Sequence, residues 1–322
     1  MSAEIAIVVP SHSRPVRLRW LLDALQEQTL ARGRWEVVVV HDDPGEATEA
    51  MLREHPLARA GVLRHRRLEP GTGTAARQRN IGWREARAPL VAFTDDDCRP
   101  GPAWLERLLA VAHRAPGAIV QGATRPDPLE AAVLKAPRVR TLHVDPPTRE
   151  CPACNVLYPR ALLERLGGFD QSFPAPAGED TDLAERARAA GAALVPAADA
   201  VVFHAVESYS LAGMARLSWK WQHLALLVKR HPGLRERVAL RVFWKPSHWR
   251  LALAAAGAAG ARRAPVLALL ALPYLRYALT VHGAGPRGIA RATRELPSRV
   301  AVDAVEFAAL ACGSARYRTL LL

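Results

Sequence analysis

The sequence contains few cysteines, hardly any lysine and no repeated segment, and these scarcities exclude several classes of protein. Four cysteines among 322 residues cannot staple a small disulfide-rich fold. No collagen period, sustained heptad pattern or fixed repeat recurs along the chain, which excludes fibrous and solenoid architectures. A secretory signal is not expected either, because Glu4 comes early and the apolar run at 5–9 is too short for its core. We therefore expect a globular protein in the reducing cytoplasm.

The size of the chain and the distribution of its charge indicate two different parts. A chain of 322 residues is long for one domain, and half of its residues are hydrophobic, which excludes wholesale disorder. Residues 1–205 contain 26 basic and 26 acidic residues, whereas residues 206–322 contain 18 basic and 5 acidic ones. Only four residues are lysine, so arginine in the last third carries the net charge of +13. Such a segment attracts nucleic acid or an anionic membrane, and its other residues must decide between them.

The first 120 residues alternate short apolar runs with helical patterns. This alternation predicts an α/β fold with a mainly parallel sheet that helices cover on both faces. In such sheets ligands bind beyond the carboxyl ends of the strands, so the residues after each strand are the candidate site. We expect strands at 5–9 (ended by Pro10), 35–40, 61–63 and 90–93, and helices at 15–29, 46–55, 74–87 and 102–114.

Polar side chains follow three of these strands, and the third group is the most informative. The loops at 10–14 and 41–45 are also compatible with ordinary capped turns, since Ser and Asp favour such positions. The loop at 94–98 differs, because Asp95, Asp96 and Asp97 are consecutive and repel each other. A divalent cation would compensate this charge, and Mg²⁺ or Mn²⁺ typically binds through one or two carboxylates plus substrate phosphates.

The section from 150 to 205 has a different pattern. Short strands are expected at 155–158, 193–195 and 200–203, and a helix at 160–166. A further helix begins at Gly178-Glu-Asp-Thr-Asp-Leu183, with acidic residues in the first turn, where the helix dipole favours them.

Seven segments in register along 200 residues are informative together. They are IVVPSHSR at 7–14, VVHDDPG at 39–45, ARQRNIG at 76–82, LVAFTDDDC at 90–98, NVLYPRALLERLGGFD at 155–170, GEDTDL at 178–183 and VVFHA at 201–205. Together these segments resemble the bacterial family 2 glycosyltransferases, which have the GT-A fold. One departure is HDDPG, where the family more often has Asp-Asp-Gly-Ser.

The resemblance implies a metal-dependent enzyme that transfers a sugar, with inversion, from a nucleotide diphosphate to an acceptor hydroxyl. It implies that Asp95 and Asp97 hold Mg²⁺ or Mn²⁺, with His204 as a further metal-side residue. Asp180 matches the catalytic base, and Glu179 and Asp182 are its rivals on the acceptor side. The donor is expected to be of the UDP or dTDP type, and Asp43 to accept from a uracil-like imide. The expected donor-binding residues are Pro10, Ser11, Arg14, Asp42, Asp43, Arg77, Arg79, Asn80, Asp95 and Asp96.

The sequence leaves one choice between two arginines open and gives no support to a functional role for two short motifs. Either Arg77 or Arg79 could offset donor phosphate charge, and the sequence does not choose between them. Gly71-Thr-Gly73 lacks the third glycine and the preceding strand of a dinucleotide-binding loop. Cys151-Pro-Ala-Cys154 is a single CxxC with no second pair, so we interpret it as coincidence, with Cys154 filling a small position.

Residues 206–322 combine basic charge with long apolar runs. The runs at 251–261 and 264–281 stay below the roughly 20 apolar residues of a membrane span. Four tryptophans at 219, 221, 244 and 249, with arginines around them, favour helices lying in an anionic membrane interface. The alternative is a basic helical subdomain packed on the catalytic domain. Nucleic acid is not expected as a partner, because such apolar runs do not suit a surface that follows phosphates.

We therefore expect a GT-A catalytic domain at 1–205 and a helical, membrane-associated tail at 206–322. Within the catalytic domain, 1–120 would bind the nucleotide sugar and 150–205 the acceptor, a lipid-linked or cell-envelope glycan. The expected location is the cytoplasmic face of the cell membrane, with a soluble cytoplasmic protein as second choice. Two alternatives stay open, namely an inactive membrane-associated scaffold of the same fold and a nucleotidyltransferase. The latter lacks support, because no glycine-rich, lysine-containing loop follows the first strand.

Overall fold

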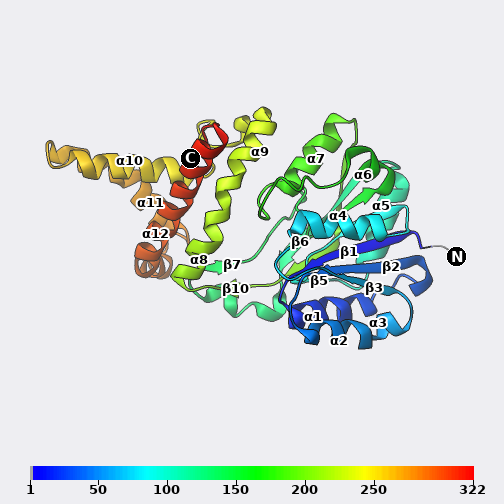
Figure 1. Cartoon of the computed structure of the whole chain (residues 1–322). Helices are drawn as coiled ribbons and strands as arrows, with labels where there is room; N and C mark the ends of the chain where they lie inside the picture. Colours follow the sequence, from blue (N-terminus) through cyan, green and yellow to red (C-terminus); the bar gives the residue numbers. More distant parts are fainter. Residues whose placement is uncertain (1–2) are drawn as a thin grey trace. The chain divides into compact units, whose positions relative to one another are not determined.

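The computed structural model describes residues 3–322, and these form two compact units. The first unit runs to Lys135 and continues from Arg140 to Glu207. The second consists of Ala136–Val139 and Ser208–Leu322. Each unit has its own helices, and only the first contains a large sheet among the described residues (Figure 1).

An eight-stranded sheet organises the first unit, in the order β3-β2-β1-β4-β8-β6-β9-β5. Four of the neighbouring pairs in this order are parallel and three are antiparallel. The expectation of an α/β fold with a mainly parallel sheet is thus confirmed. The strands are β1 (Ile5–Ser11), β2 (Trp35–His41), β3 (Leu63–Arg67), β4 (Leu90–Phe93), β5 (Cys98–Pro100), β6 (Ile119–Pro126), β8 (Val156–Pro159) and β9 (Leu194–His204).

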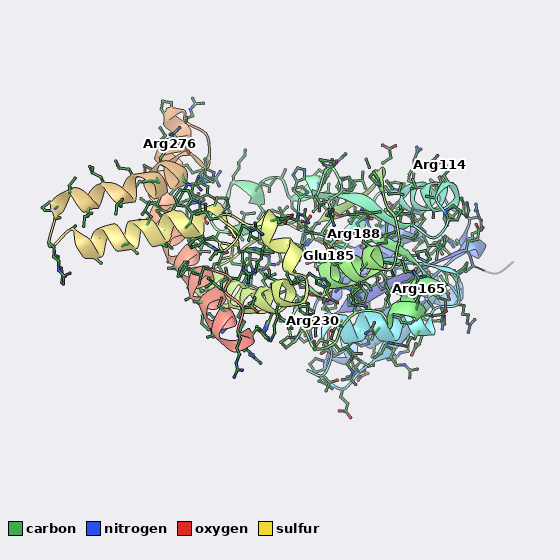
Figure 2. The ribbon with its side chains drawn as sticks, turned by 90° about the horizontal axis from the view of Figure 1, so that it is seen from above. Arg114, Arg165, Glu185, Arg188, Arg230 and Arg276 are labelled. Atoms are coloured by element: carbon green, nitrogen blue, oxygen red, sulfur yellow. The ribbon has the colours of Figure 1, made fainter. Side chains whose placement is uncertain are left out.

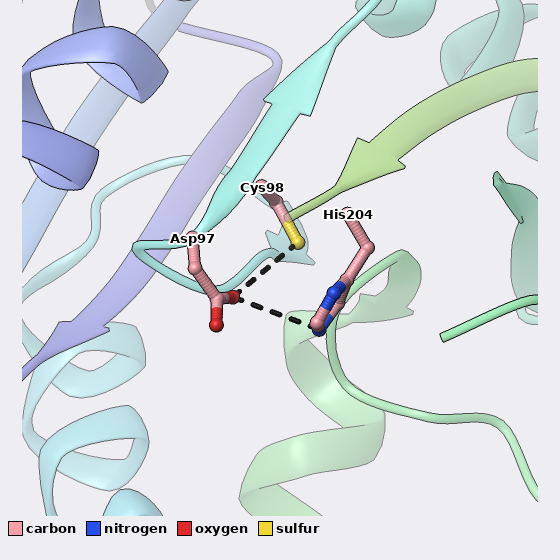
Figure 3. Close-up of side chains that lie close together, drawn as sticks. All are labelled: Asp97, Cys98 and His204. Atoms are coloured by element: carbon pink, nitrogen blue, oxygen red, sulfur yellow. Dashed lines mark hydrogen bonds and ion pairs between the residues drawn. The ribbon is translucent and has the colours of Figure 1, made fainter. Parts of the chain in front are cut away.

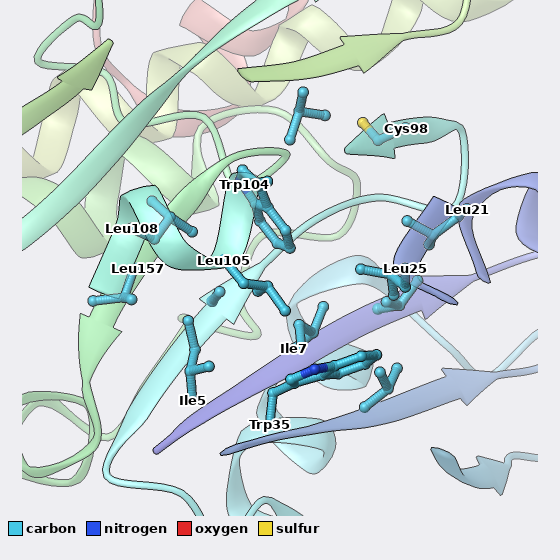
Figure 4. Close-up of a cluster of buried hydrophobic side chains, with 14 of the residues drawn as sticks. Ile5, Ile7, Leu21, Leu25, Trp35, Cys98, Trp104, Leu105, Leu108 and Leu157 are labelled. Atoms are coloured by element: carbon cyan, nitrogen blue, oxygen red, sulfur yellow. The ribbon is translucent and has the colours of Figure 1, made fainter. Parts of the chain in front are cut away.

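Helices cover both faces of this sheet because its central strands are apolar on both sides. Ile5, Ile7 and Val9 of β1 join one core cluster, with leucines of α1 and tryptophan and leucines of α5 (Figure 4). Val8 joins the opposite cluster, with residues of α4, α6 and α7. The helices are α1 (Pro15–Gln26), α2 (Glu46–Glu54), α3 (Pro56–Arg59), α4 (Ala75–Glu85), α5 (Trp104–Arg114), α6 (Arg160–Leu166) and α7 (Glu179–Ala189), with short 3₁₀ helices at Arg32–Arg34, Pro128–Glu130 and Val133–Lys135.

Strand β1 does not end at Pro10, as the sequence predicts, but includes it and Ser11. Pro10 is buried and pairs in register with Val40 of β2. The carbonyl group of Val8 faces β4, since it accepts from the Thr94 amide at 3.3 Å. Pro10 lies two residues further and faces the same side, where β4 has already ended. Its missing N–H group therefore removes no ladder hydrogen bond.

The two short strands expected at 193–195 and 200–203 are one strand, β9, with an irregularity in its middle. Gly122 of β6 pairs with Ala197, and the next residue pairs with Val201, so three residues of β9 are left over. Asn155 stabilises this bulge, because its Nδ2 donates to the carbonyl oxygens of Ala123 and Ala200 at 2.8 and 2.9 Å. The bulge interrupts the apolar pattern and accounts for the prediction of two strands.

The second unit is helical, and no helix within residues 3–322 combines the length and apolar character needed to cross a membrane. Helix α10 and the 3₁₀ helix η6 run side by side (Figure 2). The helices are α8 (Leu211–Ser218), η4 (Trp219–His223), α9 (Leu224–Arg230), η5 (Pro232–Arg237), α10 (Pro246–Gly260), η6 (Pro265–Ala271), α11 (Leu272–Thr280) and α12 (Pro286–Tyr317). A separate two-stranded sheet is formed by β7 (Val139–Arg140) and β10 (Glu207–Ser208).

A buried polar network lies between the helices of the second unit. Lys245 Nζ donates to Glu306 Oε2 at 2.8 Å, and the hydroxyl group of Tyr274 donates to Asp303 Oδ2 at the same distance. His248 Nε2 is 3.4 Å from Glu306. Because these carboxylates already have protein partners, the network is explained as internal packing of α10, α11 and α12.

Candidate functional site

The three consecutive aspartates after β4 have three different partners. The pairs are Arg79 with Asp95 at 2.7 Å, Ser11 with Asp96 at 2.8 Å, and Arg14 with Asp97. Protein groups therefore offset much of the repulsion that the sequence indicates in this loop. The interpretation of the loop as a cation site must rest on the groups beside Asp97 rather than on uncompensated charge alone.

Asp97 lies beside Cys98 and His204, which the pairing of β5 with β9 places opposite each other (Figure 3). The ligand atoms of the three side chains all lie within 4.8 Å of one another. His204 Nδ1 is 2.9 Å from the carbonyl oxygen of Ala205, which can only accept, so Nδ1 carries the hydrogen. In the neutral ring, Nε2 then carries the lone pair and lies on the side of Asp97, whose Oδ1 is 3.7 Å away.

The groups around Asp97 fit a divalent cation. Carboxylate oxygens are the ligands that Mg²⁺ and Mn²⁺ prefer, and a histidine whose second nitrogen donates to a backbone carbonyl is arranged as metal ligands usually are. Cys98 does not belong to this set. A hydrogen bond with Cys154, together with burial, raises the pKa of the Cys98 thiol well above its ordinary value. The thiol therefore stays protonated near neutral pH and is a poor ligand.

Asp96 is buried and contacts the end of β1. It is 6% exposed, and the Ser11 hydroxyl and the His12 amide both donate to its Oδ2, at 2.8 and 3.2 Å. Burial, and then the negative charge of Asp97, raises the pKa of Asp96 to about 7. Ser11 and Asp96 thus join the ends of β1 and β4. Their contact with the donor stays a prediction.

Asp42 ties two loops to the start of α4. Its carboxylate is buried and lies 2.6 Å from His12 Nδ1, 3.2 Å from Gln78 Nε2 and 3.1 Å from the Gly73 amide. Gly73 is required here, because a Cβ atom at this position would lie 2.5 Å from Gln78 Nε2 and 2.9 Å from Asp42 Cγ. The loops after β1 and before α4 are therefore fixed around one carboxylate.

Asp43 stabilises the start of α2. It accepts from the Thr48 hydroxyl at 2.6 Å and from the Gly45 amide at 2.9 Å. The hydrogen bond from Thr48, followed by that from Gly45, holds the pKa of Asp43 below its ordinary value. Asp43 is therefore a carboxylate at neutral pH, and its contact with a uracil-like imide stays a prediction.

Arg79 is the guanidinium that lies inside the site. It is 4% exposed and donates to Asp95 at 2.7 Å and to Glu179 at 2.9 Å. Its planar fork bridges two carboxylates on different elements, which a lysine could not do with the same geometry. Arg77, two residues earlier and on the other side of the same helix, is exposed and donates to the carbonyl oxygen of Thr72 at 2.9 Å. Of the two arginines that the sequence leaves open, only Arg79 contacts the acidic groups.

Asp180 is placed by an unusual start of α7. Gly178 precedes the helix with a φ of 103°, a conformation that favours glycine, so the chain turns directly into Glu179 and Asp180. Burial, and then the charge of Glu179, raises the pKa of Asp180 to about 7. A carboxylate with this pKa is suited to accept a proton near neutral pH. Glu179 is 3% exposed and accepts from Arg79, and its acceptor-side role stays a prediction.

Asp182 and Asn80 instead hold the loop that follows α6. Asp182 accepts from Arg186 at 2.8 Å, and Arg186 in turn donates to the carbonyl oxygen of Gly168 at 2.7 Å. Asn80 donates to the carbonyl oxygen of Phe169 at 2.7 Å and accepts from its amide at 2.9 Å. Both side chains are buried and make these contacts within the protein. The acceptor-side role of Asp182 and the donor-binding roles of Asn80 and Pro10 stay predictions.

The CxxC motif has no metal partners in the part of the chain that the structure describes. Cys151 and Cys154 are free and buried, and neither belongs to a cluster of metal-ligating side chains within residues 3–322. Cys154 Sγ lies 3.4 Å from the Thr124 hydroxyl, in a small buried space beside Asn155.

Sequence analysis does not single out His12 and Gln78, which complete the surroundings of Asp42. His12 lies within a matched segment, yet nothing in its neighbours shows that its ring turns toward β2. Gln78 is 3% exposed, but α4 is polar, so its hydrophobic periodicity gives little sign of which side faces inward. Ala76 and Trp83, both buried, lie seven residues apart and share one face of the helix, whereas Gln78 lies nearly opposite them, so the helical phase gives no sign of its burial either.

Comparison with known proteins shows the family of the chain. The sequence profile of the family described as "Glycosyl transferase family 2" matches residues 6–166, half of the chain. Validoxylamine A glucosyltransferase of Streptomyces hygroscopicus subsp. jinggangensis is 29% identical over 220 residues, covering 58% of this chain and 52% of that protein. Glycosyltransferase AglE of Haloferax volcanii is 27% identical over 103 residues, covering 32% of this chain and 33% of that protein. The chain spans about half the length, or less, of these curated relatives.

Two solved structures share the fold. The mannosyltransferase PcManGT from Pyrobaculum calidifontis, in complex with GDP-Man and Mn²⁺, gives a TM-score of 0.60 at 22% identity, over 99% of this chain and 88% of that one. Residues 1–349 of S. aureus TarS, in complex with UDP, give a TM-score of 0.52 at 15% identity, over 98% and 92%. At these identities the likeness shows a common fold. Together with the profile match, it identifies the chain as a member of glycosyl transferase family 2.

Proposed function

We propose that this protein is an inverting glycosyltransferase that moves a sugar from a nucleotide diphosphate to an acceptor hydroxyl. The observation that carries the proposal is the network Asp95–Arg79–Glu179, which connects the end of β4 with the start of α7, where Asp180 lies. This network connects the acidic residues after β4, which could bind a metal ion, with the neighbourhood of Asp180, whose pKa is raised. Family membership and the nucleotide-bound structural neighbours support the same assignment.

Asp97 and His204, with Asp95, would hold Mg²⁺ or Mn²⁺. When bound, such an ion acts as a Lewis acid toward the charge that develops on the departing nucleoside diphosphate. Arg14, paired with Asp97, adds a second positive group at the same strand end. Asp42 and Asp43 lie at the neighbouring end of β2, where the base and ribose of a UDP- or dTDP-type donor would be received.

Asp180 serves as the catalytic base in this proposal. Its carboxylate takes the proton of the acceptor hydroxyl, the acceptor oxygen attacks the anomeric carbon, and the bond from that carbon to the diphosphate oxygen breaks. Attack from the side opposite the leaving group inverts the anomeric configuration. Arg79 keeps Asp95 and Glu179 in place, while the Glu179 charge helps to keep the pKa of Asp180 near the working pH.

The basic second unit supports a glycan acceptor carried at a membrane. We infer a lipid-linked or cell-envelope acceptor and a location at the cytoplasmic face of the cell membrane, because the net positive charge lies in this unit together with exposed apolar side chains.

The proposal is tested with a panel of nucleotide sugars, by thermal shift with and without Mn²⁺. We expect one class of donor to raise the melting temperature only with Mn²⁺, since a ligand bound only by the folded state stabilises it. Asp180→Asn should keep this shift but lose release of nucleoside diphosphate, whereas Asp97→Asn should lose the shift itself. A panel without any Mn²⁺-dependent shift would contradict the assignment.

A further inference from the structure

An exposed apolar stripe runs along one side of η6 and the start of α11. Val266, Leu269, Leu272 and Leu275 are spaced three residues apart, and they are 66%, 58%, 56% and 36% exposed. In a 3₁₀ helix, side chains three residues apart lie directly above one another, and they remain neighbours in an α-helix. The 3₁₀ form of η6 therefore gathers these four side chains, hereafter the apolar stripe, onto one face.

The adjacent edge of η6, which carries Leu267 and Leu270, packs closely on α10 and fixes the direction of the stripe. A Cβ atom on Gly257 would lie 2.6 Å from the carbonyl oxygen of Leu267, and one on Gly260 would lie 2.6 Å from Leu267 Cδ1. Leu270 is equally close, with its Cβ 2.8 Å from that position on Gly257. The two glycines let the helices approach each other, so η6 cannot rotate to bury its apolar stripe against α10.

The stripe lies in a stretch of chain that carries positive charge only. Residues 238–294 contain nine arginines and lysines and no acidic residue. Arg262 and Arg263 are exposed in the turn before η6, and the exposed Arg276 follows Leu275 on α11 (Figure 2). Within residues 3–322, none of these three arginines forms an ion pair.

We propose that the apolar stripe is the surface with which the protein inserts shallowly into an anionic lipid layer. Its four side chains enter the boundary of the acyl region, and Arg262, Arg263 and Arg276 contact lipid phosphates. A second copy of the chain fits less well, because a symmetric pair through the stripe would bring these arginines toward one another. The inference rests on the membrane association proposed above and names the segment and the lipid charge responsible for it.

The test measures binding of the full chain to vesicles of phosphatidylcholine, alone or mixed with phosphatidylglycerol, by flotation. We expect binding to the mixed vesicles only. Leu269→Glu and Leu272→Glu should each weaken it at least about tenfold, because each removes a buried leucine and adds a negative charge. Arg262→Gln with Arg263→Gln should weaken it about fivefold per arginine at low salt. Leu240→Glu is the matched control, since Leu240 is 70% exposed in the same unit but outside the stripe.

Each variant is also tested for its melting temperature and for the Mn²⁺-dependent donor shift, which keeps this inference separate from the proposed activity. Vesicle binding without any donor shift would remove the glycosyltransferase assignment and leave the stripe in place. Equal binding to phosphatidylcholine alone, or unchanged binding of both leucine variants, would overturn the inference. Light scattering that shows a dimer which dissociates in the Leu269→Glu variant would overturn the inference and identify a second copy of the chain as the partner of the stripe.

Discussion

Replacing Arg79 by glutamine tests the network that joins the donor side of the site to the acceptor side. The guanidinium is 4% exposed and donates to Asp95 and Glu179, at 2.7 and 2.9 Å. Asp95 is partly exposed and can be hydrated when its partner is lost, with 30% of its side-chain surface accessible. Glu179 cannot, since it is 3% exposed and its Oε2 has no hydrogen-bond partner. The variant therefore leaves an uncompensated buried charge.

The expected loss of stability follows from that buried charge. Removing one member of a buried ion pair costs about 3–5 kcal/mol. For a unit of this size, 1 kcal/mol corresponds to roughly 2–4 °C, so the melting temperature of Arg79→Gln should fall by roughly 6 °C or more. The double variant Arg79→Gln with Glu179→Gln should recover most of the loss, because neither charge is then left unpaired.

The measurement is thermal and urea unfolding of the two single variants, the double variant and Arg77→Gln. Arg77 is a matched control on the same helix, and its exposed side chain should contribute less than about 0.5 kcal/mol. Turnover should fall in Arg79→Gln, because Asp95 is released and the pKa of Asp180 rises when a neighbouring positive charge is lost. Equal stability of Arg79→Gln and Arg77→Gln, or no recovery in the double variant, would refute the reasoning.

Three further predictions concern the same site. Turnover should rise with pH as Asp180 deprotonates, with a midpoint near pH 7. Glu179→Gln should move this midpoint to lower pH by roughly one unit, because a like charge is removed. A pH–rate profile whose midpoint does not move would contradict the assigned cause. Asp97→Ala should abolish the effect of Mn²⁺ on donor binding while titration calorimetry still shows weak metal-free binding. Gly178→Ala should destabilise the first unit by about 1 kcal/mol or more and lower turnover, because φ is 103° there; unchanged denaturation curves would show that the turn is not strained.

Sequence patterns were sufficient for the central strands and insufficient at the sheet edges. β1, β2 and β4 are continuous apolar runs because neighbours cover both of their faces, and all three are predicted within a residue or two. β3 is predicted at 61–63 but lies at Leu63–Arg67. It is an edge strand whose side chains are mostly basic and partly exposed, so it lacks the apolar pattern. No strand is predicted at Ile119–Pro126, where Gln121, Gly122 and Thr124 interrupt the run.

Residue types at the site were identified from the sequence more readily than their partners. The acidic groups after β4 stand out because three consecutive carboxylates repel each other, and those at the start of α7 stand out because they lie in a segment that carries the resemblance. Their contacts depend on how side chains turn in three dimensions, and no local pattern records that. Asn80 and Asp182 lie in motifs that the resemblance connects with the site, yet both hold the loop after α6. A motif indicates which part of the chain lies near the site, but the function of each residue in it depends on its hydrogen-bond partners.

The arrangement explains why a chain poor in lysine can still balance so many carboxylates at one sheet edge. Each arginine fork offers several donors in one plane, so Arg79 satisfies Asp95 and Glu179 together, although 100 residues separate Arg79 from Glu179. Arg14 in the same way lies between Asp96 and Asp97. Because each of these arginines contacts two carboxylates, a substitution at the end of one strand changes the electrostatic environment of the next. Loss of Arg79 must therefore affect both Asp95 and the protonation of Asp180, which a set of separate ion pairs would not do.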